Sequence, residues 1–214
     1  MPLIDLHCHT LPRSTCSQLQ PRDLVEAARE AGIDGICLTE HDRWWPETEL
    51  DALRQRTGFL IFSGVELTTD LGHVLAFGLP ESASSAVAAE LAARAAEHGA
   101  LLFLAHPARD SLLRLNRQVI DTFASVEAIN GSDSHLKNMA ATGMSRAFRL
   151  PGIAGSDAHT LEEAGRAATR FLDPTADNAS LLAALHAGRY EAVSLERNSP
   201  SPAKSGEAES LPRG

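Results

Sequence analysis

The 214-residue sequence is poor in cysteine and in long apolar runs. Its cysteines, Cys8, Cys16 and Cys37, are odd in number and contain no Cys-x-x-Cys pair, which argues against a disulfide framework or a structural zinc knuckle. No apolar run approaches the ~18 residues that a membrane-spanning helix needs. The N-terminus has neither the basic nor the apolar region of a signal peptide, so we expect a cytoplasmic protein that does not associate with membranes.

Positive charge is also scarce. The chain has 19 Lys and Arg against 28 Asp and Glu, a net charge of −9 with nine neutral histidines. A surface of this charge repels polyanions, so we expect no extended nucleic-acid surface, although a local basic pocket for one phosphate is compatible with it. Bound divalent cations would offset part of the negative charge. The length fits one α/β domain, and the sequence leaves the oligomeric state open.

Strand-like and helical patterns alternate along the chain, which predicts βα units and a mostly parallel sheet. The expected strands cover residues 2–6, 33–39, 59–65, 73–79, 101–105, 124–129, 152–155 and 167–172. The expected helices cover 21–31, 47–56, 112–118, 134–149 and 178–187, with a further one that Ser84 or Ser85 caps and that ends before Gly99. From Asn198 the composition shifts to Ser, Pro, Gly, Lys and Glu, so we expect a domain over 1–197 and a disordered tail over 198–214.

Histidines and acids gather where the expected strands end. Seven of them follow this rule: His7, His9, His41, Glu66, His106, Asp157 and His159. His73 starts the hairpin return beside Glu66, and a strand period of two places His7 and His9 on one side. In a parallel barrel the C-terminal strand ends share one face. Eight ligands exceed the three or four that one zinc ion needs, so the pattern predicts two or three metal ions, with Glu66 as the bridging carboxylate.

Six motifs carry a family resemblance. They are Asp-Leu-His-Cys-His-Thr, Thr-Glu-His-Asp, Gly-Val-Glu, Gly-His-Val-Leu, Ala-His-Pro and Gly-Ser-Asp-Ala-His, in this order from residue 3 to about residue 195. The sequence thereby resembles the PHP (polymerase and histidinol phosphatase) family of metal-dependent phosphoesterases. The resemblance implies a distorted, TIM-like (β/α)7 barrel with a trinuclear site of zinc, manganese or iron.

The resemblance also implies three ligand sets. His7, His9, Glu66 and Asp157 would hold the first metal, Glu66, His73 and His106 the second, and His41 and His159 the third. The family usually adds an Asp or His from the loop after the first motif. Residues 12–17 contain neither, and Cys16 stands nearest the expected place. Its thiolate either substitutes as a ligand or is inert.

The implied chemistry is attack by metal-activated water on a phosphate ester, with His159 and His41 on the leaving-group side. Arg13, Arg43 and Arg109 lie near the ligand motifs and are candidates for binding substrate phosphate, with solvated loop arginines as the alternative. Other neighbours of the motifs also allow two interpretations each. Asp5 and Asp42 are candidates for orienting the ligand imidazoles, and Asp42 has the alternative of forming a turn. Trp44 and Trp45 either stack on the substrate or pack as hydrophobic side chains at the start of a helix.

We therefore expect a hydrolase of phosphate mono- or diesters of a small, nucleotide-like substrate. Three alternatives stay open: a 5′-to-3′ exonuclease on short oligonucleotides, a histidinol phosphate phosphatase, and a non-catalytic PHP module that serves a partner protein. A non-catalytic module tends to lose ligands, whereas eight of nine expected ligand positions are occupied here.

Overall fold

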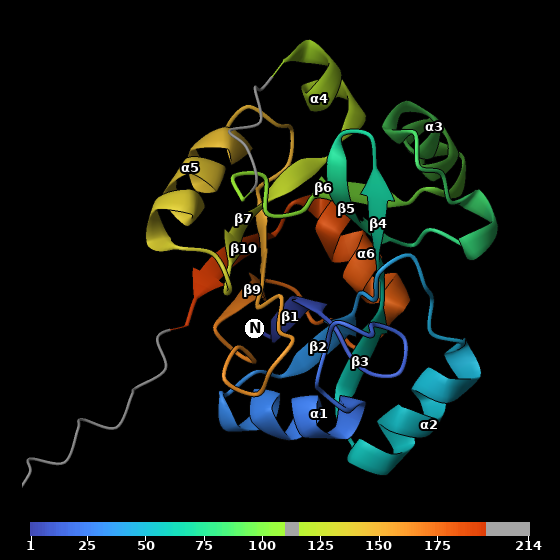
Figure 1. Cartoon of the computed structure of the whole chain (residues 1–214), viewed down its shortest axis with the longest axis vertical. Coiled ribbons are helices and arrows are strands. Elements are labelled where there is room, and N and C mark those ends of the chain that lie inside the picture. The colour runs from blue at the N-terminus through green and yellow to red at the C-terminus, as the bar shows by residue number, and fades with distance from the viewer. Residues whose placement is uncertain (110–115, 196–214) are drawn as a thin grey trace, which may run out of the picture.

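Two five-stranded sheets form the framework (Figure 1) of a computed structural model that describes residues 1–109 and 116–195. The first sheet has the order β10–β9–β1–β2–β3, made of β1 (Leu3–Cys8), β2 (Gly35–Leu38), β3 (Leu60–Ser63), β9 (Ala167–Phe171) and β10 (Tyr190–Ser194). The second has the order β4–β5–β6–β7–β8, made of β4 (Val65–Thr69), β5 (Gly72–Phe77), β6 (Leu101–Leu104), β7 (Ser125–Asn130) and β8 (Ile153–Gly155).

Both sheets are mixed, and they do not close into one barrel. Strands β1, β2 and β3 are parallel, as are β6, β7 and β8, but β9, β10 and the β4–β5–β6 meander run antiparallel. Within the described residues, isolated bridges link the sheets, between Cys8 and Ala158 and between His41 and Glu66. Strands β4 and β5 form the expected hairpin. Because a two-residue turn can only join antiparallel strands, this hairpin is one reason why the expectation of a mostly parallel sheet is wrong. The closed (β/α)7 barrel is not confirmed.

Helices flank both sheets, and the last of them also packs into the core between the sheets. They are α1 (Pro21–Glu30), α2 (Glu47–Thr57), α3 (Ala88–His98), α4 (Arg117–Thr122), α5 (His135–Ser145) and α6 (Asn178–Ala187), with a 3₁₀ turn at Glu81–Ala83. Helices α1 and α2 pack on β2 and β3, α3 packs on β6 and α5 on β7, whereas α6 contacts both β3 and β6 (Figure 1). No helix in the described ranges is long and apolar enough to span a membrane.

The expected helices are present within the described residues, and one of them starts later than expected. Helix α3 begins at Ala88 after Val87, so the expected cap at Ser84 or Ser85 is wrong. The helix expected at 112–118 and the expected tail at 198–214 fall largely or wholly outside the described residues. Strand β10 was not expected, although it extends the first sheet beside β9.

The core between the sheets determines where polar groups can gather. Phe62, Phe77, Phe103 and Phe171 are almost fully buried in this layer, together with residues of α6. Burying each such side chain contributes about 1.5–3 kcal/mol. Because α6 and these rings fill the interior, the polar residues that follow β1, β2, β6 and β8 collect at the opposite, C-terminal ends of those strands.

The chain crosses from the first sheet to the second at Gly64. A single strand over 59–65 ending at Glu66 was expected, but β3 ends at Ser63 and Glu66 is the second residue of β4. A Cβ atom on Gly64 would lie 3.0 Å from Cys37 Sγ and 3.0 Å from Thr39 Cγ2, so glycine permits this close crossing. Glu66 therefore starts a strand of the second sheet, opposite His41 of the isolated bridge.

We predict that Gly155→Ala destabilises the fold, because the new Cβ would lie 2.4 Å from His7 Cβ. Overpacking of this kind costs about 1–3 kcal/mol of unfolding free energy, measurable by urea denaturation. Gly143→Ala is the matched control, since a Cβ added to this residue of α5 would meet nothing within 4 Å, and it should stabilise by about 0.5–1 kcal/mol. Equal stabilities of the two variants would contradict the close β1–β8 contact.

Candidate metal centre

The structure brings together all eight side chains that the sequence singled out. They lie at or after the ends of β1, β2, β6 and β8 and at the start of the β4–β5 hairpin: His7, His9, His41, Glu66, His73, His106, Asp157 and His159. Within the described residues, these side chains form four overlapping groups whose ligand atoms lie within 4.8 Å of one another. The shared position at the C-terminal strand ends therefore corresponds to a real cluster.

His7 and His9 are at the centre of the first expected ligand set. His7 Nε2 lies 3.0 Å from His9 Nε2, 3.3 Å from Glu66 Oε2 and 3.4 Å from Asp157 Oδ1. His9 Nε2 lies 3.1 Å from Glu66 Oε2 and 3.2 Å from Asp157 Oδ1. Within the described residues these side chains divide between two close groups, one of His7, His9 and Glu66 and one of His7, His106 and Asp157. Imidazole nitrogens and carboxylate oxygens at this spacing are suitable ligands for a divalent cation.

The second oxygen of Glu66 belongs to another set. Glu66 Oε1 lies 3.0 Å from His73 Nδ1 and 2.9 Å from His106 Nε2. Glu66 Oε2, which also lies 3.0 Å from His41 Nδ1, is buried and forms no hydrogen bond within the described residues. A buried carboxylate oxygen without a hydrogen bond is costly, and a cation among its imidazole neighbours would compensate it.

The third set is built of imidazoles. The His9 ring stacks on those of His41 and His159, with centroid distances of 4.3 and 4.5 Å, and the latter two centroids lie 6.1 Å apart. Their ligand atoms form one of the four groups, which does not include Cys16. The Cys16 thiol is exposed, and partial burial together with nearby carboxylates raises its pKa, which disfavours the thiolate. The structure does not bring Cys16 into the described cluster.

The charges of the cluster compensate one another. Burial alone would raise the pKa of Glu66 and of Asp157, but the His7 imidazole and its neighbours hold both pKa values well below their ordinary range. Burial would lower the pKa of His7, but Asp157, Glu127 and Glu66 raise it well above its ordinary value. Burial and the adjacent His9 lower the pKa of His159. The two central acids are thus anionic at neutral pH.

Backbone strain concentrates here. Among the described non-glycine residues, Asp42, His106 and Asp157 have positive φ values of 53°, 29° and 53°. Such conformations persist where surrounding contacts impose them and are frequent at functional sites. Asp42 accepts hydrogen bonds from Thr68 N–H and Thr68 Oγ1 at 2.9 and 3.0 Å, so its carboxylate connects the loop after β2 to β4, and within the described residues it makes no hydrogen bond to an imidazole.

Glu127 and Asn130 of β7 are part of the site but were not singled out from the sequence. Glu127 Oε1 lies 2.9 Å from His7 Nδ1, and Oε2 accepts hydrogen bonds from His106 N–H and Asn130 Nδ2. The available signal was an acid in the middle of an otherwise apolar strand, where burial demands partners. Asp5 has a different role, since its Oδ1 accepts from the backbone N–H groups of His7 and Ser156.

The three arginines lie in different environments. Arg109 Nη2 lies 2.6 Å from Asp157 Oδ2, and its Nε donates to Asp133 Oδ1 at 3.0 Å. Arg13 is held by Glu49 and by Trp44 O. Arg43 is exposed and makes no hydrogen bond or ion pair within the described residues. Among these three arginines, Arg43 is therefore the one whose guanidinium is available to bind a phosphate.

The two tryptophans also differ. Trp45 is buried, its Nε1 donates to Glu40 at 2.9 Å, and the Arg13 guanidinium lies 3.8 Å above its ring. Trp44 is half-buried, donates to Leu79 O and lines a hollow of about 540 Å³ with Pro12, Arg13, Arg43 and Glu81. Trp44 is therefore the tryptophan available to a ligand.

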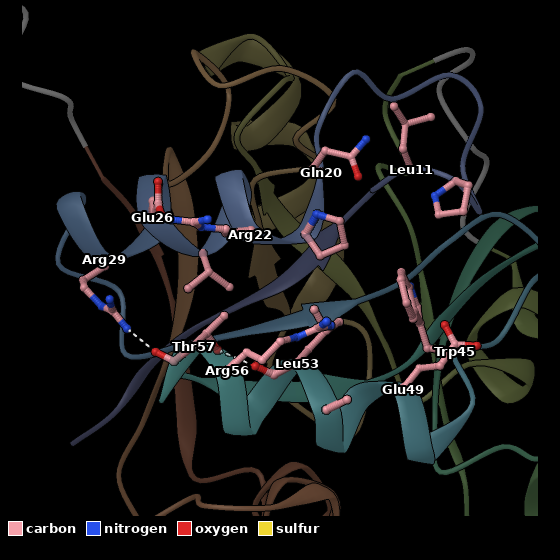
Figure 2. Close-up of a pocket in the computed structure, with 14 residues that line it drawn as sticks. Leu11, Gln20, Arg22, Glu26, Arg29, Trp45, Glu49, Leu53, Arg56 and Thr57 are labelled. Atoms are coloured by element: carbon pink, nitrogen blue, oxygen red, sulfur yellow. Dashed lines mark hydrogen bonds and ion pairs between the residues drawn. The ribbon is translucent and has the colours of Figure 1, made fainter.

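A larger cleft of about 990 Å³ lies between α1 and α2, away from the metal ligands (Figure 2). Its floor is apolar, and Arg22, Arg29 and Arg56 project from the helices around it. Arg22 pairs with Glu26, and Arg29 donates to Thr57 O. None of the eight clustered side chains lines this cleft, so it is not the reaction pocket.

Comparison with known proteins places the chain in a family. The sequence profile of the PHP domain matches residues 5–141, and a PHP-associated profile matches residues 135–190. Since the PHP domain profile covers more than half of the chain, the protein belongs to the PHP family.

Individual relatives are more distant. A stretch of 81 residues is 31% identical to an error-prone DNA polymerase of Cutibacterium acnes, covering 38% of this chain and 6% of the polymerase. A two-domain protein from Bacteroides vulgatus, which contains a predicted PHP-like metal-dependent phosphoesterase, superposes with a TM-score of 0.71 at 20% identity over 91% of this chain and 65% of its own. The chain thus spans less than two thirds of both.

A third relative bears on nucleic acid. Endonuclease Q, solved with a 27-mer duplex carrying an abasic lesion, superposes with a TM-score of 0.61 at 18% identity, over 89% of this chain and 58% of its own. A protein of this fold thus accommodates DNA. The expectation of no nucleic-acid surface is therefore unsupported.

We predict that Arg109→Lys weakens metal retention about 10–100-fold, because lysine cannot contact Asp133 and Asp157 together. Competition with a chelator measures this loss. If Arg109 instead binds substrate phosphate, the Michaelis constant rises while metal retention stays at the wild-type level, which would contradict the positioning role.

Proposed function

We propose that the protein is a metal-dependent hydrolase of phosphate mono- or diesters, acting on a small, nucleotide-like substrate with two or three zinc, manganese or iron ions. Family membership supports the metal-dependent phosphoesterase class. The single observation that carries the proposal is the Glu66 carboxylate, buried among five imidazoles with one oxygen lacking a hydrogen bond.

We assign the ligand sets as the family resemblance implies them. His7, His9, Glu66 and Asp157 would hold the first ion, Glu66, His73 and His106 the second, and His41 and His159, with His9 beside them, the third. In support of the proposal, each set contains at least two members of one of the close groups. Divalent cations here would supply a water of lowered pKa and polarise the phosphate ester. Cys16 is not assigned.

The exposed edge of the cluster indicates where the substrate approaches. The side chains of His41, His73 and His159 are 33%, 37% and 26% exposed, whereas those of His7 and His9 are fully buried. Substrate phosphate therefore reaches the ions from the side of these three imidazoles. We place the leaving oxygen beside His41 and His159, of which His159 has its Nδ1 within 3.0 Å of Asp157 O.

Two hollows support a small substrate: clustered side chains line the first, and the second is lined in part by Arg43 and Trp44, which follow His41 closely in the chain. One of about 460 Å³ includes His73 and His106 in its wall, and ligand pockets for small molecules start at about 300 Å³. Arg43 and Trp44 line the hollow of about 540 Å³, where an aromatic face and a guanidinium suit a base and a phosphate.

Short oligonucleotides are the second candidate. The hollow at Arg43 and the α1–α2 cleft share Pro12 in their walls, so a strand bound at Arg43 has a path toward Arg22, Arg29 and Arg56. The fold shared with Endonuclease Q is compatible with this candidate.

We predict that protein purified without chelator contains two to three equivalents of zinc, manganese or iron by elemental analysis. It should hydrolyse p-nitrophenyl phosphate or bis-p-nitrophenyl phosphate, and a chelator should abolish turnover, because the acids and imidazoles alone offer no comparable electrophile. The preferred ester decides between monoesterase and diesterase. Protein that takes up no metal even on reconstitution refutes the proposal, and metal without turnover of any phosphate ester favours a non-catalytic module.

We predict that Trp44→Ala raises the Michaelis constant for a nucleoside monophosphate about 10-fold, the effect of about 1–2 kcal/mol of stacking, and leaves hydrolysis of p-nitrophenyl phosphate little changed. Steady-state kinetics on both substrates measure the difference. Arg56→Ala is the companion variant: a loss confined to oligonucleotides would support the strand path through the cleft. Unchanged nucleotide kinetics in Trp44→Ala would exclude stacking.

A further inference from the structure

Glu127 is a fully buried acid in the middle of β7, a strand that otherwise packs apolar or small side chains. Burial of a carboxylate without partners costs several kcal/mol, so its contacts must compensate it. All three contacts lead to the metal cluster. Oε1 lies 2.9 Å from His7 Nδ1, while Oε2 accepts from His106 N–H at 2.8 Å and from Asn130 Nδ2 at 2.9 Å.

These contacts define the direction of each hydrogen bond. A carboxylate oxygen can only accept, so His7 Nδ1 must donate to Oε1. In the neutral imidazole, the form that binds a cation, the lone pair then lies on Nε2, which is the nitrogen that faces His9, Glu66 and Asp157. A histidine with the other tautomer would direct a proton at the same point and could not bind a cation there.

Asn130 connects Glu127 to a second candidate ligand, Asp157. Its Nδ2 donates to Glu127 Oε2 and lies 3.2 Å from Asp157 Oδ2. Its Oδ1 accepts from Arg109 Nη2 at 3.0 Å, so the amide cannot rotate without losing both kinds of contact.

We propose that Glu127 is the positioning residue of the metal centre: it sets the tautomer of His7, holds the backbone of His106, and through Asn130 holds the carboxylate of Asp157. The inference rests on the proposed function, because it takes His7, His106 and Asp157 as metal ligands. Glu127 touches neither metal nor substrate and acts through the residues that do.

Glu127→Gln tests the inference because the side chain keeps its size but gains a donor. The position of Oε2 receives two N–H groups, so the amide oxygen must occupy it and the NH₂ group must face His7 Nδ1. His7 Nδ1 then becomes an acceptor, and its proton moves to Nε2. We expect metal affinity at the first ligand set to fall about 10–100-fold in chelator competition, with one equivalent of zinc lost at limiting zinc.

Ser125→Ala is the matched control. Ser125 is fully buried two residues earlier on β7, and its Oγ has no hydrogen-bond partner within the described residues. The variant perturbs the interior of the same strand without touching an imidazole and should retain zinc like the wild type. Equal retention in Glu127→Gln and Ser125→Ala would overturn the inference, whereas a wild-type protein that takes up neither zinc, manganese nor iron would overturn the proposed function instead.

A measurement on the wild-type protein covers the case in which Glu127→Gln does not fold. Long-range ¹H–¹⁵N correlation spectra of the zinc-loaded protein identify the protonated nitrogen of each histidine ring. We expect a proton on His7 Nδ1 and zinc at Nε2. Zinc at Nδ1 would refute the positioning role without affecting the presence of the metal centre.

Discussion

The contacts of one buried carboxylate, that of Glu66, hold the two sheets in register at the site. Imidazole nitrogens of five histidines lie within 2.9–3.3 Å of its oxygens. His7, His9 and His41 belong to segments of the first sheet, and His73 and His106 to the second. An isolated anion at 1% exposure would cost many kcal/mol, so the surrounding imidazoles and the cation they fit decide whether this arrangement is stable.

The cluster divides into a rigid interior and an accessible edge. His7 and His9 are fully buried and have their other ring nitrogens occupied, by Glu127 in one case and by Ser14 Oγ at 3.3 Å in the other. His41, His73 and His159 are partly exposed. The interior histidines are thus held in one geometry, while the edge is open to water and small molecules.

Sequence reasoning identified the cluster because strand-end position translates directly into shared location. It failed where pairing between distant segments decides the outcome. The crossing at Gly64 depends on the room beside Cys37 and Thr39, which no local pattern reveals. Glu127 looked like one polar residue in a strand because its partner His7 is 120 residues away. Arg109 was expected near phosphate, but only the fold shows that Asp133 and Asp157 already hold it.

The central place of β1 in the first sheet has a consequence for biosynthesis. This strand is made before its partners, since Asp5 Oδ1 accepts from Ser156 N–H across 151 residues, and β9 is its neighbour. At about 5–20 residues per second, the ribosome needs roughly 8–30 s to supply those partners. The cluster of His7, His9 and Asp157 therefore forms only after residue 157 has been made, and it requires that the segments of both sheets have come together.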